Sequence, residues 1–139
     1  MKLLLDTNVV IDIVSKRPGY AASRDVLRFC ELGKAKGFIS TTTVTDAVYV
    51  LKKYLAPGDV REAMRTLLHI VDVAVVQKPD IVCALIDGWK DFEDAVQAAC
   101  AARNKMDYIV TRNIVDFTDS AVKAVLPDEA LVICGSSSP

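Results

Sequence analysis

Short apolar runs alternate along this chain with longer segments in which apolar residues recur at helical spacing, and this alternation constrains the fold more than any other feature. Runs of this length that end at polar or turn residues are typical of buried strands. When such strands alternate with helices, the connections cover both faces of a parallel sheet. We therefore predict an α/β protein, a three-layer α/β/α domain with a five-stranded parallel sheet flanked by helices. The predicted strands are 2–5, 38–41, 71–76, 108–111 and 131–134, and the predicted helices are 8–14, 20–34, 42–55, 59–69, 79–88, 93–103 and 120–125.

Two of these helices carry recognisable start signals. Thr42 or Thr43 can cap the helix that follows the second strand, because a threonine hydroxyl accepts a hydrogen bond from the first helical turn. Asp59, with Glu62 three residues later, has the pattern of a capping box for the next helix.

The composition argues against a membrane protein and favours a cytoplasmic one. The 139 residues are 52% hydrophobic, but the longest apolar runs are far shorter than the roughly 18–20 residues of a spanning helix. A secretory leader is not expected, because Asp6 ends the first apolar run after three residues. The 4 cysteines form no CxxC pair, and we expect all of them to be reduced core residues. We expect a single domain over residues 1–134 and a flexible tail over 135–139.

Charge and histidine content limit the kinds of site that the chain can build. The 17 basic and 18 acidic side chains give a formal net charge of −1. This balance argues against a long, sequence-independent contact with nucleic acid, but it allows a small site that holds a few nucleotides through a metal ion. The single histidine, His69, excludes a site that needs two imidazoles, and with it most zinc hydrolase arrangements.

Four aspartates fall where the predicted fold has its crevice, at the carboxyl edge of the sheet. Asp6 directly follows the first strand, and Asp116 lies a few residues after the fourth. Asp46 is expected in the first turn of the helix after the second strand, and Asp94 near the start of the helix that returns into the fourth. Ligands of parallel α/β sheets bind at this edge, so we predict that the four side chains share one site.

A shared site of this kind needs a counter-ion. Carboxylates within a few ångströms repel one another by roughly 4 kcal/mol per close pair at an effective dielectric near 20. A divalent cation removes this penalty, and all-oxygen ligands favour Mg²⁺ or Mn²⁺ over zinc. A water molecule made acidic by such a metal can attack a phosphodiester. Either Asp94 or Asp116 could accept the proton of that water.

Four motifs in the same order resemble those of PIN-domain nucleases, particularly the VapC-type toxins of toxin–antitoxin pairs. They span nearly the whole chain, and the fourth, at its distance from the third, is the more specific. They are Leu4-Leu5-Asp6-Thr7-Asn8-Val9, then Thr43-Val44-Thr45-Asp46, then Asp91-Phe92-Glu93-Asp94-Ala95, and finally Tyr108-Ile109-Val110-Thr111-Arg112-Asn113 with Asp116-Phe117.

The resemblance implies a PIN-like fold and a metal-dependent endoribonuclease that hydrolyses RNA. It implies that Asp6, Asp94 and Asp116 hold Mg²⁺ or Mn²⁺, with Thr111 and Asn113 in supporting roles. Asp46 departs from the family, which usually has glutamate there; the shorter side chain is expected to reach the metal through water.

The resemblance also implies partners. A small antitoxin protein would place a basic side chain or helix in the acidic crevice, and no membrane is involved. Such domains commonly pair as homodimers, for which apolar faces of the helices 20–34 or 44–55 are candidates.

Simpler interpretations of individual residues stay open at this stage. Asp6 could be only a helix cap, and Asp46 only a solvated acid in a first helical turn. Asp91 and Glu93 compete with Asp94, as Asp119 and Asn113 compete with Asp116. Trp89 could stack on a base or only pack, and Arg112 could contact phosphate or only solvent.

Two alternative functions also stay open. The first is a PIN-fold interaction module with little or no activity. The second is an aspartate-based phosphotransferase with Asp6 as nucleophile. That chemistry typically needs a second acid two residues on, where this chain has Asn8, and a suitably placed lysine, which we do not find.

Overall fold

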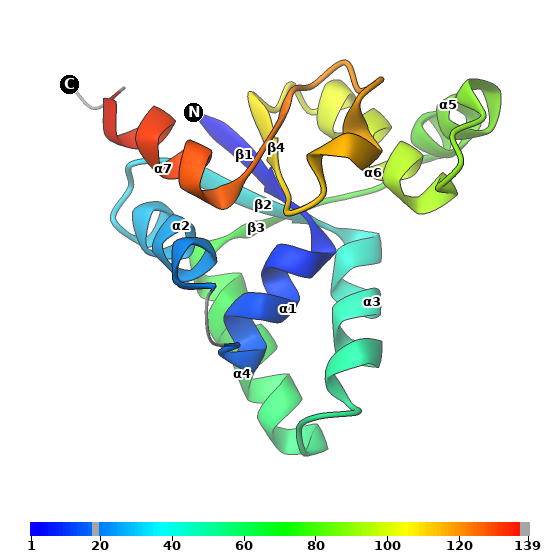
Figure 1. Cartoon of the computed structure of the whole chain (residues 1–139). Coiled ribbons are helices and arrows are strands. Elements are labelled where there is room, and N and C mark those ends of the chain that lie inside the picture. Colours follow the sequence, from blue (N-terminus) through cyan, green and yellow to red (C-terminus); the bar gives the residue numbers. More distant parts are fainter. Residues whose placement is uncertain (18–19, 137–139) are drawn as a thin grey trace.

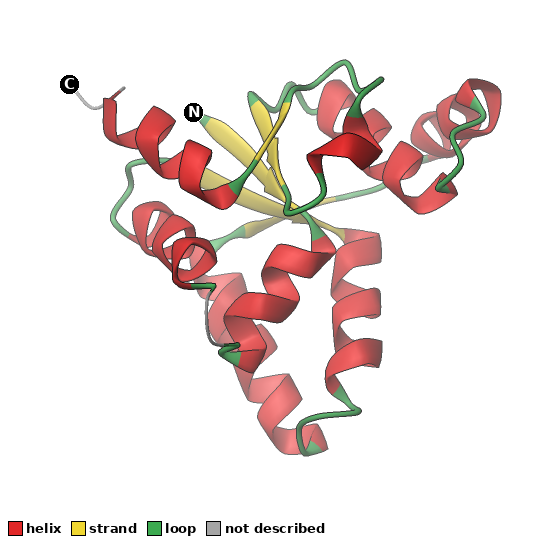
Figure 2. Cartoon of the chain, viewed as in Figure 1, coloured by secondary structure: helices red, strands yellow, loops and turns green. Residues whose placement is uncertain are grey.

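The computed structural model describes residues 1–17 and 20–136, and it places a twisted sheet between helices (Figure 1, Figure 2). The strands are β1 Lys2–Leu5, β2 Lys36–Ser40, β3 Asp72–Ala74, β4 Tyr108–Val110 and β5 Ala124–Val125. The helices are α1 Thr7–Ser15, α2 Ala21–Glu31, α3 Thr41–Leu51, α4 Pro57–Ile70, α5 Lys78–Asp87, α6 Phe92–Arg103 and α7 Pro127–Ser136, with a 3₁₀ helix, η1, at Ile114–Phe117.

The sheet has the order β3-β2-β1-β4-β5, and every neighbouring pair is parallel. This confirms the predicted α/β architecture with a five-stranded parallel sheet. β1 lies at the centre, where Leu4 is in register with Phe38 of β2 and with Ile109 of β4. Because the strands run the same way, the segments that leave β1, β2 and β4 all start at one edge of the sheet, and these segments lead into α1, α3 and η1.

The two faces of the sheet are covered by different helices. Side chains alternate along a strand, so Leu3 and Leu5 of β1 enter the core formed with α1–α4 and α7. Leu4 enters the opposite core with residues of α6 and with Phe117 of η1. α5 packs on α6 through a smaller cluster that includes Ala84 and Ala95, and it projects from the body of the molecule (Figure 1).

The predicted position of the fifth strand is wrong. Residues 131–134 lie in α7, and β5 is formed by Ala124 and Val125, inside a segment predicted to be helical. A four-residue apolar run does not distinguish a strand from a buried helix, and here Cys134 is buried whereas Val132 is 70% exposed. Pro127 followed by Asp128 and Glu129 is a helix-start signal that explains the difference. α7 includes the first two residues of the expected tail, 135–136, and residues 137–139 lie outside the described part of the chain.

Both predicted helix starts also differ from the structure. α3 begins earlier than expected, because the Ser40 side chain accepts a hydrogen bond from the backbone N–H of Thr43 at 3.2 Å. α4 begins at Pro57 without a side-chain cap, so the Asp59 capping box is not formed. A proline in the first helical turn leaves fewer N–H groups to satisfy.

Three of the cysteines are buried, as expected, but the expectation is wrong for Cys83, which is exposed on α5. The same helix exposes three aliphatic side chains, Val82, Leu85 and Ile86. Among residues 1–17 and 20–136, no helix combines the length and the apolar character that crossing a bilayer requires.

Candidate active site

Asp6 directly follows β1, and its side chain is fixed by three donors. Its Oδ1 accepts hydrogen bonds from the Thr7 backbone N–H at 2.8 Å and from Gln97 Nε2 at 3.2 Å. Its Oδ2 accepts a hydrogen bond from Thr111 Oγ1 at 2.8 Å. Burial raises the pKa of Asp6 and outweighs these three donors, which lower it. Asp6 is therefore a helix cap, as the simpler interpretation held, and also a buried carboxylate in the middle of a polar network.

Thr111, at the end of β4, connects the elements around this carboxylate. Its hydroxyl donates to Asp6 and lies 3.4 Å from Asn8 Nδ2, which donates to it. It also accepts a hydrogen bond from the backbone N–H of Asn113 at 3.1 Å. The two residues expected to support the site differ in their contacts, since Thr111 reaches Asp6 through its side chain and Asn113 reaches only Thr111, through its backbone.

Gln97 is a site residue that the sequence analysis missed. Its side chain is buried, and its Nε2 donates to Asp6 and, at 3.0 Å, to Thr43 Oγ1 on α3. Its Oε1 is buried without a hydrogen-bond partner among the described residues. The available signal was its position three residues after Asp94, on the same face of α6.

Asp94 is in electrostatic contact with the two other predicted metal ligands. Its backbone N–H donates to Oδ1 of Asp91, the cap of α6, at 3.0 Å. Burial raises the pKa of Asp94 to about 7, and the charges of Asp6, Asp91 and Asp116 add to this effect. Carboxylates from β1, α6 and η1, far apart in the sequence, therefore come close enough to influence one another.

Asp46 contacts Glu93 rather than one of the three predicted metal ligands. Because α3 begins at Thr41, Asp46 lies in the second turn rather than the first, and it faces Glu93 at the start of α6. A hydrogen bond between the two carboxyl groups raises the pKa of Glu93 to about 8, with burial and the charges of Asp46, Asp91 and Asp94 as further causes. Glu93 thus joins Asp46 to the other acids, and sequence reasoning had treated it only as a competitor of Asp94.

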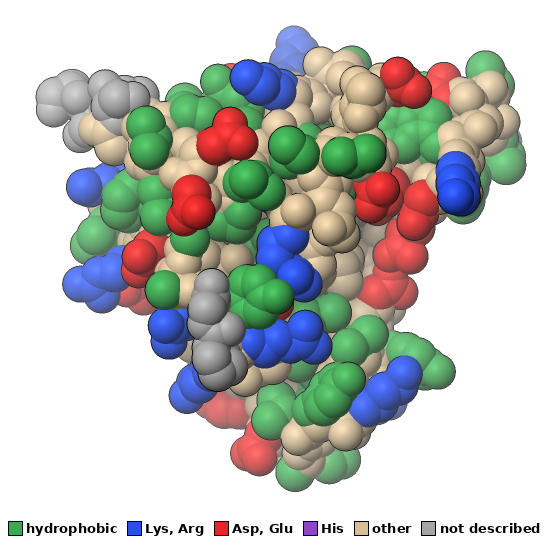
Figure 3. All heavy atoms as spheres, viewed as in Figure 1, with side chains coloured by type: hydrophobic (Ala, Val, Ile, Leu, Met, Phe, Trp, Pro, Cys, Tyr) green, Lys and Arg blue, Asp and Glu red, His purple; other side chains and the backbone are tan. Residues whose placement is uncertain are grey.

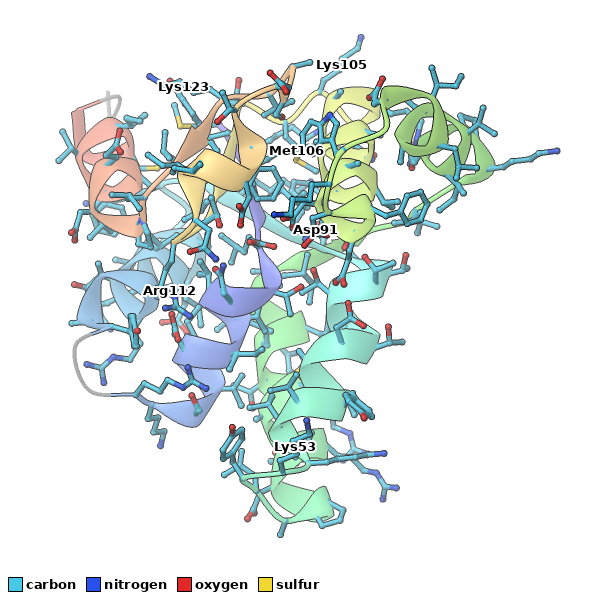
Figure 4. The ribbon with its side chains drawn as sticks, turned by 45° about the vertical axis from the view of Figure 1, so that its right-hand side comes forward. Lys53, Asp91, Lys105, Met106, Arg112 and Lys123 are labelled. Atoms are coloured by element: carbon cyan, nitrogen blue, oxygen red, sulfur yellow. The ribbon has the colours of Figure 1, made fainter. Side chains whose placement is uncertain are left out.

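Acidic side chains gather where α6 begins beside the start of α3 (Figure 3). Asp91 marks this position in Figure 4. Among the described residues, no three Asp, Glu, His or Cys side chains are already arranged as a metal-binding group. The chemistry of the donors nevertheless fits a hard divalent cation, because they are all carboxylates. Burial raises the pKa of Asp94 and the hydrogen bond with Asp46 raises that of Glu93, and in both cases the charges of neighbouring carboxylates add to the effect. Mg²⁺ retains several waters, so it does not need a closed set of protein ligands.

Arg112, between Thr111 and Asn113 in the sequence, forms an ion pair with Asp12 of α1. Its Nε lies 2.7 Å from Oδ2 of Asp12, a fully buried residue of α1. Its guanidinium also covers the ring of Tyr20, 4.5 Å from the centroid, and donates to the Tyr20 hydroxyl at 2.9 Å. Figure 4 shows Arg112 between α1 and α2. This residue therefore ties the loop after β4 to α1 and α2, and it is only partly exposed to solvent.

A cavity of about 950 Å³ adjoins the acids, between the loop joining α5 to α6 and the segment around η1. Asp91, Glu93 and Asp116 are part of its wall, together with Trp89 and Phe92. Its volume lies in the range of small-ligand sites. Taken together, these features define an α/β domain with an acidic, partly buried site at the carboxyl edge of a parallel sheet.

Comparison with known proteins agrees with this description. A family model described as PIN domain matches residues 2–115, and the chain therefore belongs to the PIN domain family. This confirms the resemblance seen in the sequence. A search of curated proteins finds no match.

Several solved structures share the fold. A chain of a toxin–antitoxin complex from Klebsiella pneumoniae has 23% sequence identity and a TM-score of 0.69, with 90% of this chain and 97% of that chain covered. A chain of the DNA-bound VapBC complex from Salmonella typhimurium has 18% identity and a TM-score of 0.71, with 91% and 98% covered. VapC20 from Mycobacterium tuberculosis, described as a sarcin–ricin loop cleaving toxin, has 12% identity and a TM-score of 0.61, with 77% and 86% covered.

Proposed function

We propose that this protein is a metal-dependent endoribonuclease and the toxin of a toxin–antitoxin pair. The observation that carries the proposal is the raised pKa of Asp94, which the charges of Asp6, Asp91 and Asp116 help to cause. Carboxylates this close together repel one another, and a divalent cation between them removes that repulsion. Membership in the PIN domain family and the shared fold with chains of toxin–antitoxin complexes support the same interpretation.

In this proposal, Asp6, Asp94 and Asp116 hold Mg²⁺ or Mn²⁺, and Asp46 assists them through Glu93 or through water. When bound, the cation offsets the repulsion among the carboxylates and lowers the pKa of water. Asp6 serves as a fixed negative charge, because the donors Thr7, Gln97 and Thr111 occupy both of its oxygens.

The proton of the attacking water is then accepted by Asp94 or Asp116. Asp94 is half-buried and Asp116 is exposed. The phosphotransferase alternative is disfavoured by the burial of Asp6, which is 6% exposed, because a nucleophilic carboxylate must be open to the approach of a phosphoryl group.

RNA is the proposed substrate, because one protein with the same fold is described as cleaving the sarcin–ricin loop. The proposed partner is a small antitoxin that places a basic side chain among the carboxylates. The acidic cavity next to Asp116 supports this, since a cationic group is attracted there. The product of a small gene beside this one should suppress the cleavage; a neighbouring product that leaves it unchanged would count against the toxin assignment.

A homodimer is also proposed, with a different contact from the one first expected. Within the two helices first expected to form the contact, 20–34 and 44–55, the exposed large apolar side chains are Leu32 (57%), Tyr49 (68%) and Tyr54 (64%). α5 instead exposes Leu85 (66%) and Ile86 (79%) close to one another, beside Val82. A compact apolar surface of this kind is typical of a protein-binding face.

The proposal is tested by incubating the purified chain with structured and unstructured RNAs, with Mg²⁺ or Mn²⁺ and with a chelator. Cleavage should require the metal. We expect Asp6→Asn to reduce the rate by at least about 100-fold. Loss of a group that only supports a metal ligand costs up to about 100-fold, and loss of a ligand itself should cost more. Asp25→Asn, which changes an exposed acid of α2, is the matched control and should retain full activity. A wild-type protein that cleaves no RNA under any of these conditions would support the inactive interaction module instead.

A further inference from the structure

The 950 Å³ cavity beside the acids is also lined by apolar side chains, which have no role in the proposed chemistry. Phe92, the first residue of α6, lines it and is 46% exposed. Val115 of η1 also lines it and is 80% exposed, the largest exposed fraction among the chain's exposed large apolar side chains. Because both side chains lie in the wall of one cavity, a ligand bound there would cover them together and remove this apolar surface from water.

A third apolar side chain in this wall is held in place. The ring of Trp89 packs edge-on against Phe117, with centroids 6.2 Å apart and planes at 79°. Trp89 is half-buried by this contact and still contributes to the cavity wall. Trp89 follows directly after Gly88, which ends α5 with a backbone φ of 65°. Residues other than glycine rarely adopt this angle. The aromatic wall is therefore preformed.

The charges of the cavity wall indicate whether it would hold the phosphate or the base of a nucleotide. Lys90 is the cationic residue of the lining, against carboxylates that include Asp87 and Asp119 as well as Asp116. An additional phosphate would be repelled by these carboxylates, whereas an uncharged base would not. Bases stack on aromatic side chains in sites for single-stranded nucleic acid.

We propose that Phe92, Trp89 and Val115 form a subsite for one unpaired nucleobase of the substrate, next to the phosphodiester group that water attacks beside Asp94 and Asp116. This inference rests on the proposed nuclease function and adds a substrate class to it, namely RNA with an unstacked nucleotide beside the cleaved bond. Phe92 is the specificity-determining contact, since it is both aromatic and exposed. Duplex RNA, whose bases are stacked and paired, is excluded from this subsite.

Binding is measured without turnover in the Asp6→Asn protein, because Asp6 does not line the cavity. The fluorescence of Trp89, the single tryptophan of the chain, reports occupancy. The probes are single-stranded hexauridylate and hexaadenylate and an abasic oligonucleotide of equal length, with Mg²⁺ present. We expect the two base-bearing probes to change the fluorescence and to bind about 10-fold more tightly than the abasic probe.

Variants of Phe92 then test the assignment. Phe92→Ala should weaken binding of the base-bearing probes by about 5- to 100-fold, and Phe92→Tyr should preserve it. Tyr49→Ala, which removes an exposed aromatic ring of α3 outside the cavity wall, is the matched control and should have no effect. Circular dichroism of each variant establishes that it is folded.

Several results would overturn the subsite: equal affinity for abasic and base-bearing probes, unchanged affinity in Phe92→Ala, or binding of a lysine-rich peptide with no binding of any oligonucleotide. The nuclease proposal is tested separately by RNA cleavage with the wild-type chain. If the wild type cleaves RNA and Phe92→Ala leaves KM unchanged, the subsite is wrong and the nuclease stands. If base-dependent binding occurs but the wild type cleaves no RNA, the base subsite stands and the nuclease proposal is wrong.

Discussion

At the scale of single residues, the carboxyl group of Asp94 makes the metal-free protein less stable as the pH rises. Its pKa is raised from an ordinary value of 3.8 to about 7 in the folded chain. Between these values the unfolded chain has released the proton and the folded chain still binds it. The stability that this difference represents is present below about pH 4 and is lost as the pH rises to about 7.

Asp94→Asn should therefore stabilise the metal-free protein at pH 8 by about 1 kcal/mol, a value reduced from the full linkage energy because the carboxyl group is only half-buried. The difference should nearly vanish at pH 4. Urea unfolding at the two pH values measures it, with Asp25→Asn as the control. Equal stability of wild type and Asp94→Asn at pH 8 would show that burial and the neighbouring charges do not raise the pKa of Asp94 as described.

The residues that the sequence identified are those whose position follows from the chain alone. Asp6 and Asp116 follow strands, so a parallel sheet brings them to the same edge whatever the details of packing. Gln97 was missed, and Glu93 was considered only as a competitor of Asp94, because their roles depend on contacts between α6 and its neighbours. The position of Gln97 three residues after Asp94 indicates a shared face of α6, but the partners on the neighbouring elements leave no pattern within the sequence of α6.

At the scale of elements, Gly37 determines how closely α2 approaches β2. A Cβ atom at this position would lie 2.8 Å from Cys30 Sγ and 2.9 Å from Val71 Cγ1. We expect Gly37→Ala to lower the free energy of unfolding by about 1–3 kcal/mol, because the buried neighbours must move apart. Thermal unfolding followed by circular dichroism measures the change.

Gly58 offers the contrasting substitution, since a Cβ there meets no heavy atom within 4 Å. It lies in the first turn of α4, so Gly58→Ala should raise stability by up to about 1 kcal/mol. Similar losses of stability in both variants would mean that close packing at Gly37 is not the cause.

The difference between β5 and α7 shows what limits a sequence-based description of elements. β5 is only two residues long and pairs with β4 alone, so it has no periodicity to detect. The run 131–134 is apolar because α7 packs it against α2 and the sheet, not because it is a strand. Elements with several turns, such as α4 and α6, were predicted to within two residues at both ends, because their periodic pattern is long enough to identify.

At the scale of the whole molecule, the exposed aliphatic face of α5 predicts self-association. Light scattering at micromolar concentration should give about twice the mass of one chain. Ile86→Lys should give a single-chain mass, because a charge in an apolar contact is strongly unfavourable. Val132→Lys, on the exposed side of α7, should leave the dimer intact. If the wild type is a monomer, or if only Val132→Lys disrupts the dimer, the exposed face of α5 is not a dimer contact.

The overall architecture was the most predictable level, since alternating strands and helices allow few arrangements. The shape of the cavity was not predictable, because it arises from the packing of Trp89 on Phe117 and from the exposure of Phe92 and Val115. These contacts join segments whose sequences carry no shared pattern.

The central claim is that a divalent cation binds between carboxylates from three separate segments. Diffraction from crystals soaked in Mn²⁺, recorded near the manganese absorption edge, locates the metal directly. We expect an anomalous peak bounded by Asp6, Asp94 and Asp116, and no such peak at that position in Asp6→Asn crystals. Manganese bound only elsewhere on the surface, or equally well in both proteins, would contradict it.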